Sequence, residues 1–343
     1  MIMIDTNLLL TMTPASIKKF YSYKENKKYC SLYNRTSVYI IAKRPVSTVR
    51  IINEKSELHA FFDVPQDVKI YHQTHADNKK AYEDSVNYYM EMIKRRKVLA
   101  LEISQSVSNN KILGLFELSD GISAESIKKH ITELTFEDFF YSSYLETGTF
   151  VCRDDVSPFV TYEVLYVGQC VNEPLTKRFK AHHKLQEMLV LEDVISKDYS
   201  NSDELVLLPF CSYSESLSVI NGKSNPDDMI NAFANSLSIN NKQIELDCEK
   251  ALVHGMNPKY NQIKFSGYPQ SKDGLANSCA DVYSYVIAAD VILKYKTGAI
   301  YGSSKLVDSS RIVGDCLDNS VTVYNPNELY TQKYNSIIFP RNL

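Results

Sequence analysis

The stretch Val164-Leu165-Tyr166-Val167-Gly168 has the β-branched and aromatic composition of a strand that ends at a glycine. A second strand-like run, Thr149 to Arg153, precedes it, and a polar turn containing Pro158 separates the two. Strands joined by a short connection commonly pair with each other. The sequence therefore predicts a hairpin here.

Further elements follow this hairpin along the chain. Pro174 to Val190 has the apolar spacing of a helix. Leu205-Val206-Leu207-Leu208 is typical of a buried central strand. One helix is expected to begin at Asn225, and another to run from about Asn241 to His254 and end at Gly255. The order β-β-α-β-α-α predicts an α+β module with a small antiparallel sheet.

The flanking regions are expected to form separate parts. Strand-like runs begin at Val38-Tyr39-Ile40-Ile41, and helical spacing extends from Asn78 to Lys97. We therefore expect an N-terminal α+β domain at 1–145, the module at 146–265, and a C-terminal extension at 266–343. The extension packs on the module or folds separately, and it carries no chemistry that the sequence identifies.

Composition limits the class of protein. The 343 residues, of which 44% are apolar, suffice for about two domains. The cysteines lie far apart, without the spacing of zinc ribbons or redox motifs, which indicates reduced thiols in a cytoplasmic protein. The Leu8-Leu9-Leu10 run follows Asp5 and has no basic segment before it, so we expect neither a signal peptide nor a membrane partner.

The net charge of -3 means that any surface that binds a polyanion must be local. One basic cluster, Lys94 to Lys97, lies in the N-terminal region. The densest cluster consists of Lys177, Arg178, Lys180, His182, His183 and Lys184. A solvated helix face is the alternative interpretation of these residues.

Candidate catalytic residues occur in four pieces. They are Tyr166-Val167-Gly168, Arg178 with His182, Glu249-Lys250-Ala251-Leu252-Val253, and Pro258-Lys259-Tyr260-Asn261. Phosphodiester cleavage needs activated water, a cation beside the phosphate, and often a metal ion. Arg178 and His182, four residues apart, would share one helix face and reach one phosphate. Glu249 offers the hard oxygen ligand that magnesium prefers.

These pieces, in this order, resemble the GIY-YIG nuclease superfamily over roughly residues 148–261. The resemblance implies a metal-dependent endonuclease that hydrolyses phosphodiester bonds in DNA with one Mg²⁺ (or Mn²⁺). It also implies that Tyr166 positions or activates the attacking water, Arg178 binds the scissile phosphate, His182 assists proton transfer or contacts the phosphate, Glu249 holds the metal ion, and Asn261 closes the site by hydrogen bonding. From charge alone, Lys177, Lys180, His183 and Lys184 would hold the nucleic-acid backbone.

One residue departs from the family pattern. The family places a tyrosine on the first hairpin strand, where Gly148-Thr149-Phe150 offers Phe150, which has no hydroxyl. Tyr162 lies on the same strand as Tyr166, about 13 Å away if extended, so it should not reach the same place. Two other hypotheses therefore remain open: a catalytically degenerate module that binds nucleic acid, and a protein-interaction protein.

Two further points stay open. Glu245, one helical turn before Glu249, is the alternative metal ligand. The expected partner is nucleic acid, with DNA as the expected substrate. A homodimer is one possible arrangement, because a single site of this type cuts one strand at a time.

Overall fold

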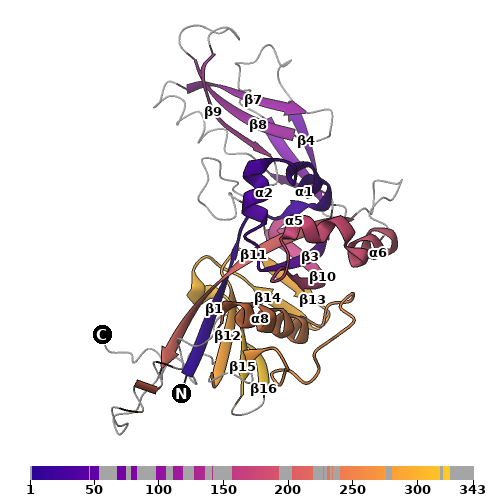
Figure 1. The fold of residues 1–343 in the computed structure, drawn as a ribbon. Helices are drawn as coiled ribbons and strands as arrows, with labels where there is room; N and C mark the ends of the chain where they lie inside the picture. The colour runs from indigo at the N-terminus through magenta and orange to yellow at the C-terminus, as the bar shows by residue number, and fades with distance from the viewer. Residues whose placement is uncertain are drawn as a thin grey trace. The chain divides into compact units, whose positions relative to one another are not determined.

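A computed structural model describes most of the segment that carries the candidate residues (Figure 1). The described residues are 2–45, 47–53, 68–74, 79–82, 98–105, 111–118, 127–135, 141, 157–192, 203–218, 227, 230–231, 234, 240–275, 280–316 and 320–324. Phe150 and the expected strand at 149–153 lie outside them, as does most of the helix expected from Asn225.

The chain divides into two compact units, each discontinuous in sequence. The first comprises Met1–Arg44, Thr161–Val194 and Glu204–Leu343, and the second comprises Pro45–Val160 and Ile195–Asp203. The boundaries expected from the sequence, after residues 145 and 265, stay predictions.

The second unit contains two small antiparallel sheets. One consists of β4 (Ser47–Asn53), β5 (Val68–Thr74) and β6 (Lys79–Tyr82), and the other of β7 (Val98–Gln105), β8 (Lys111–Leu118) and β9 (Ile127–Thr135). The helical spacing expected from Asn78 onward is wrong at its start, because Lys79–Tyr82 pairs with β5 as a strand. Residues 83–97 lie outside the described part.

The first unit is built on one mixed ten-stranded sheet. The strands are β1 (Ile2–Leu10), β2 (Ala15–Ser16), β3 (Val38–Pro45), β10 (Thr161–Gln169), β11 (Asp203–Ser218), β12 (Val282–Ile287), β13 (Ile292–Tyr295), β14 (Gly298–Tyr301), β15 (Arg311–Asp315) and β16 (Ser320–Tyr324). Their order is β14-β13-β10-β3-β11-β1-β12-β15-β16, and β2 pairs with β11 off this path. Pairs β1/β12 and β10/β13 are parallel. Figure 1 shows β1 and β11 as long neighbouring strands, which pair antiparallel.

The expected fold, a β-β-α-β-α-α module with a small antiparallel sheet between two flanking regions, is therefore wrong. Strands from both flanking regions lie in the same sheet as β10 and β11. The apolar runs of β3 and β12 are largely or wholly buried, as central strands require. Hydrophobic patterning predicts that such runs form strands, but it does not encode which distant strand each one pairs with.

Short helices and one long helix accompany this sheet. They are α1 (Ile17–Tyr23), α2 (Lys27–Tyr33), α5 (Leu175–Arg178), the 3-10 turn η3 (Phe179–Ala181), α6 (His183–Leu191) and α8 (Asn241–Met256). A core cluster, which includes Phe20, Tyr39, Phe179 and Leu207, packs α1, α5 and α6 against strands of the sheet. Within the described residues, no helix is long and apolar enough to cross a membrane.

Helix α8 carries Glu249 and packs on β10, β15 and β16. Asn240 caps its start by accepting a hydrogen bond from the Lys242 backbone N–H at 2.9 Å. The helix ends later than expected: Asn257, with φ of 48°, takes the left-handed conformation that the sequence assigned to Gly255. Gly255 instead remains helical and faces Ile312.

Candidate functional site

Strands β3 and β10 pair antiparallel and place Tyr39 directly opposite Gly168. The pairing shifts register between Val164 and Tyr166, which leaves Leu165 as an extra residue on β10. Such bulges bend a strand and redirect the side chains beside them. The described neighbour of the Tyr166-Val167-Gly168 segment is therefore β3, and the side chain that this strand brings to it is Tyr39.

The Tyr39 hydroxyl joins two of the candidate residues. Arg178 Nε donates to it over 3.1 Å, and His182 Nε2 lies 2.7 Å away. The Leu185 backbone N–H donates to His182 Nδ1 over 2.9 Å, so in the neutral ring the proton is on Nε2. The Tyr39 oxygen thus accepts two N–H groups. Burial outweighs the lowering effect of Arg178 and raises the pKa of the Tyr39 hydroxyl, so the hydroxyl keeps its proton.

The helix expected over Pro174–Val190 is interrupted at His182. Its ψ of 88° is not helical, and its ring caps the N-terminus of α6 through Leu185. The expectation that Arg178 and His182 share one helix face is therefore wrong. They meet because both side chains hydrogen-bond to the Tyr39 hydroxyl, Arg178 from the end of α5 and His182 from the start of α6.

His182 is held as a neutral, oriented ring. Burial and the nearby Arg178 charge lower the pKa of His182 to about 4. Because both ring nitrogens are occupied, the geometry suits positioning of Tyr39 rather than exchange of protons with a substrate. The ring also lies edge-on to Tyr166, with centroids 5.3 Å apart.

Tyr166 and Glu249 complete the cluster. Burial raises the pKa of Tyr166, and the Glu249 charge raises it further, whereas Arg178 and hydrogen bonding to Arg178 and Tyr39 oppose the rise. Burial raises the pKa of Glu249 to about 7, although the Arg178 and Lys250 charges lower it. Tyr39, Tyr166, Arg178 and Glu249 are therefore close enough to perturb one another's ionisation.

Two devices hold Tyr166 and Glu249 in place. Asn261, predicted to close the site, makes a two-way contact with the backbone of Val167: its Oδ1 accepts from the N–H over 2.9 Å, and its Nδ2 donates to the carbonyl over 2.8 Å. Two residues before Glu249, buried Asp247 accepts hydrogen bonds of 2.6 Å from the hydroxyls of both Tyr268 and Tyr285. These contacts tether β10 and α8 respectively.

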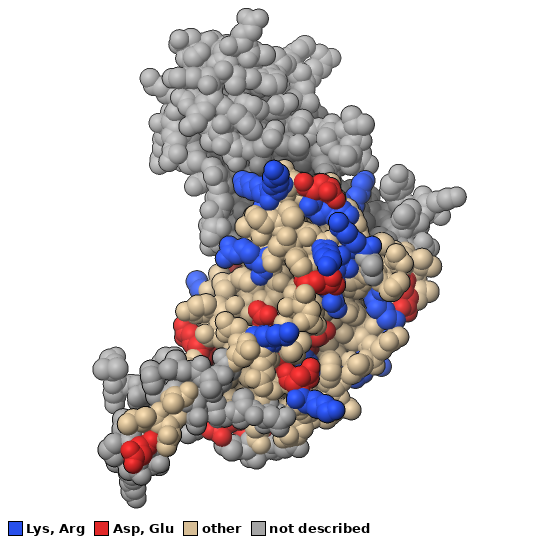
Figure 2. All heavy atoms as spheres, in the orientation of Figure 1, with Lys and Arg blue, Asp and Glu red and all other residues tan. Residues whose placement is uncertain are grey.

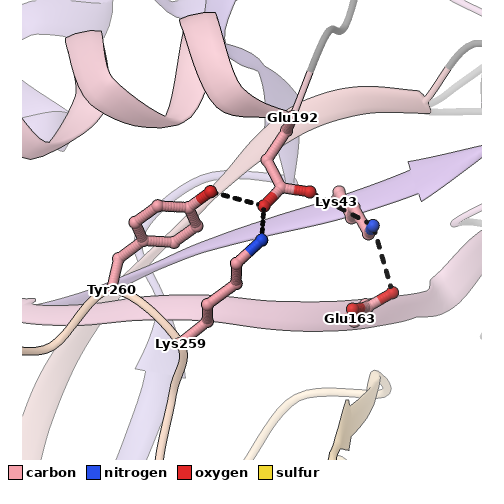
Figure 3. Close-up of polar contacts among 5 residues, drawn as sticks. All are labelled: Lys43, Glu163, Glu192, Lys259 and Tyr260. Atoms are coloured by element: carbon pink, nitrogen blue, oxygen red, sulfur yellow. Dashed lines mark hydrogen bonds and ion pairs between the residues drawn. The ribbon is translucent and has the colours of Figure 1, made fainter.

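The segment that carries Asn261 is also fixed by ion pairs (Figure 3). Glu192, at the end of α6, accepts from the Tyr260 hydroxyl at 2.6 Å and from Lys259 Nζ at 2.7 Å. Its other oxygen lies 3.3 Å from Lys43 Nζ, which also pairs with Glu163 on β10. Burial raises the pKa of Glu192, but the hydrogen bonds from Lys259, Tyr260 and Lys43 outweigh it and lower the pKa to about 2.

The four residues predicted to hold the nucleic-acid backbone lie beside Arg178 in sequence. Lys177, Lys180 and His183 are exposed. Lys184 is half-buried and forms an ion pair of 2.5 Å with Glu187 on the same helix. Three of the four are therefore accessible on the surface.

A metal ion fits the chemistry of Glu249 better than that of Glu245. Within the described residues, no hydrogen bond or ion pair engages the half-buried Glu249 carboxylate, whereas Glu245 accepts from Ser212 Oγ over 3.4 Å. No cluster of three or more His, Cys, Asp or Glu side chains is found in the part of the chain that the structure describes. A magnesium ion held by one carboxylate and waters does not require such a cluster.

Sequence reasoning missed Tyr39. It sought the first tyrosine at Phe150, which lies outside the described residues, because that was the strand nearest to β10 in sequence. The available signal was the run Val38-Tyr39-Ile40, a second strand with a central tyrosine. Tyr39 lies 139 residues from Arg178 and 143 from His182, too far for a local pattern to connect them.

Comparison of the chain with protein-family models, curated proteins and solved structures found no match.

Proposed function

We propose that this chain is a metal-dependent endonuclease that hydrolyses phosphodiester bonds in nucleic acid, with DNA as the expected substrate. One observation carries the proposal: the hydroxyls of Tyr39 and Tyr166, the Arg178 guanidinium and the Glu249 carboxylate gather at one place. A cation, proton-transfer groups and a hard metal ligand are the parts that phosphodiester hydrolysis needs.

Arg178 would bind the scissile phosphate. Its Nε is committed to Tyr39, which fixes the plane of the guanidinium, and its terminal nitrogens are the groups suited to two phosphate oxygens. Tyr39 fills the role of the first tyrosine, for which the resemblance to GIY-YIG nucleases offered only Phe150. This supports the catalytic hypothesis over the degenerate binding module.

The tyrosines would orient the attacking water by hydrogen bonding through their hydroxyls. The Tyr39 oxygen accepts from Arg178 and His182, so its own proton is directed to a third group. Both tyrosines have a raised pKa, chiefly from burial, so they are neutral before substrate binds. His182 and Asn261 would act as positioning residues, on Tyr39 and on the backbone next to Tyr166 respectively.

Glu249 would hold one Mg²⁺ or Mn²⁺, which would supply charge neutralisation at the phosphate. Among the described residues its carboxylate has no hydrogen-bond partner, and burial raises its pKa to about 7. The missing partner leaves the carboxylate available to a cation, and the cation would replace the proton that burial favours.

A cytoplasmic location belongs to the same proposal. Among the described residues, Cys30, Cys170, Cys211, Cys248 and Cys316 are free thiols. This is typical of proteins in reducing compartments. Cutting both strands of a duplex would need a homodimer or two successive nicks.

A cleavage assay on supercoiled plasmid with magnesium or manganese tests the proposal. The parent should nick or linearise the plasmid, and folded Arg178→Ala and Glu249→Ala proteins should not. Glu215→Ala, which removes an exposed carboxylate on β11, is the control and should cleave like the parent.

Failure of the parent to cleave with either divalent ion would contradict the proposal. Salt-sensitive binding of nucleic acid by that inactive parent would then favour the binding-only hypothesis. Binding that ignores salt would favour a protein-interaction role.

A further inference from the structure

A hollow of about 260 Å³ lies between the α1–α2 segment and the α5–η3 turn. It is lined by Lys24, Glu25, Lys27, Cys30, Thr176 and Lys180. The sequence pointed to Lys180 as a backbone contact but not to the lysines of the α1–α2 segment. We call this hollow, whose lining contains Lys24, Lys27 and Lys180, the basic hollow.

Positive charge is concentrated around it. Residues 16–35 carry six lysines and arginines and a single acid, Glu25, and residues 173–184 carry four and a single acid, Glu173, which pairs with Arg178 at 3.9 Å, whereas the whole chain has a net charge of -3. Figure 2 shows lysine and arginine side chains gathered over α1, α2 and α5. The basic residues of this region therefore lie next to Arg178.

The lysines of the basic hollow are available to an anion. Within the described residues, none of Lys24, Lys27 and Lys180 forms an ion pair with a carboxylate. Lys27 and Lys180 are exposed, and Lys24 Nζ lies 4.2 Å from the centre of the Tyr21 ring. Glu25, in the same lining, offsets one of these three charges, so the hollow keeps a net positive charge that favours an anion.

The walls of the hollow are fixed to the candidate active site. The Tyr21 hydroxyl donates to the Phe179 carbonyl over 2.8 Å, and the Phe20 and Phe179 rings meet edge-on at 5.0 Å. Thr176 Oγ1 donates to Asn34 Oδ1 over 2.7 Å. Thr176 and Lys180 flank Arg178 in the α5–η3 turn, so one structural element places both the hollow and the guanidinium.

We propose that the basic hollow binds the phosphodiester backbone of the nucleic acid next to the scissile phosphate. The inference rests on the proposed function for its substrate class. A phosphate chain presents regularly spaced anions, which match cations that continue from Arg178 onto α1 and α2. The contact is to the sugar-phosphate backbone, so it contributes to affinity and register and not to sequence preference.

The test measures binding of fluorescein-labelled DNA, single- and double-stranded, by anisotropy in EDTA across a salt series. The charge-removing variant is Lys24→Gln/Lys27→Gln/Lys180→Gln. The matched control is Lys242→Gln/Lys294→Gln/Lys296→Gln, which removes three exposed lysines on α8 and the β13–β14 hairpin. Circular dichroism verifies that both proteins are folded.

Loss of three phosphate contacts should weaken binding at least on the order of a hundredfold at about 0.1 M salt, and should reduce the slope of log affinity against log salt by roughly 2 for single-stranded DNA and roughly 3 for the duplex. The control should stay within about threefold of the parent, as expected for lysines that make no phosphate contact. Equal binding by the two triple variants, or a parent without salt-sensitive DNA binding, would overturn the inference. A third result would also overturn the inference: the parent binds vesicles containing phosphatidylserine but not DNA, and the triple variant of the basic hollow loses vesicle binding. That result would favour an anionic membrane as the ligand.

The plasmid assay separates this result from the proposed function. A parent that cleaves plasmid but binds DNA independently of the basic hollow keeps the function and loses the inference. A parent that binds through the hollow and never cleaves keeps the inference as a binding surface and loses the catalytic proposal.

Discussion

The Tyr39 ring lies against Gly168 on the neighbouring strand, so closely that a methyl group there has no room. A Cβ at Gly168 would be 2.5 Å from both Cζ and Oη of Tyr39, and 2.9 Å from a ring carbon of Tyr166. The glycine that ends the Tyr166-Val167-Gly168 motif therefore makes space for both tyrosines of the candidate site.

Gly168→Ala should displace the Tyr39 hydroxyl from Arg178 and His182. Overpacking of this kind costs about 1 to 3 kcal/mol of unfolding free energy, measurable by urea denaturation. Gly267→Ala is the matched control, because nothing lies within 4 Å of a Cβ at Gly267. Equal stability and equal cleavage by the two variants would mean that Tyr39 is not held as described.

The position of Tyr39 marks the limit of what the sequence could predict. Tyr166, Arg178, Glu249 and Asn261 are predicted site residues from short pieces in a fixed order, and in the structure they lie near one another. The partner strand was assigned to residues 149–153 because consecutive strands usually pair. Residues 149–153 lie outside the described part, so that pairing stays a prediction. The pairing that the structure shows joins β3 to β10, strands separated in sequence by residues 45–160 of the second unit, and no local pattern in either strand specifies it.

Glu249→Gln should stabilise the metal-free protein at alkaline pH. Because burial raises the Glu249 pKa from 4.5 to about 7, the unfolded chain loses this proton first, and the parent loses stability as pH rises through that range. Above about pH 7 the variant should be more stable on the order of 2 kcal/mol, and below about pH 4.5 the difference should vanish. Thermal unfolding across pH measures this.

Magnesium should make the parent more stable than Glu249→Gln above about pH 7. An ion bound at Glu249 stabilises only the folded parent, so its melting temperature should rise with magnesium concentration while that of Glu249→Gln stays constant. Glu215→Gln should respond like the parent. A magnesium-dependent rise of equal size in Glu249→Gln would place the ion elsewhere.

Glu192→Gln should weaken the protein at neutral pH and not in strong acid. The ion pairs of Figure 3 lower the Glu192 pKa to about 2, so its stabilisation is complete above about pH 4.5 and is lost as pH falls toward 2. At pH 7 the loss should be on the order of 1 kcal/mol, since solvent screens part of the interaction. Glu187→Gln, which breaks an exposed pair with Lys184, should cost less than about 0.5 kcal/mol. A pH-independent cost for Glu192→Gln would refute the ion-pair account.

The helix ends show a second limit of sequence reasoning. His182 is not among the usual capping residues, yet its Nδ1 accepts the hydrogen bond that starts α6. Gly255 is the residue most suited to a left-handed helix end, yet Asn257 takes that conformation. In both places tertiary contacts decide the outcome: Tyr39 holds the His182 ring, and Gly255 faces Ile312.

The most direct test of the proposed function of the candidate site is the single-turnover cleavage rate of Tyr39→Phe beside that of Tyr162→Phe, with magnesium and saturating protein. Each variant removes the hydroxyl of one buried tyrosine, but it is the Tyr39 hydroxyl that hydrogen-bonds to Arg178 and His182. Tyr39→Phe should cleave at least about a hundredfold more slowly while still binding DNA, and Tyr162→Phe should cleave like the parent. Equal rates for Tyr39→Phe and the parent would show that the cluster is not the site of catalysis.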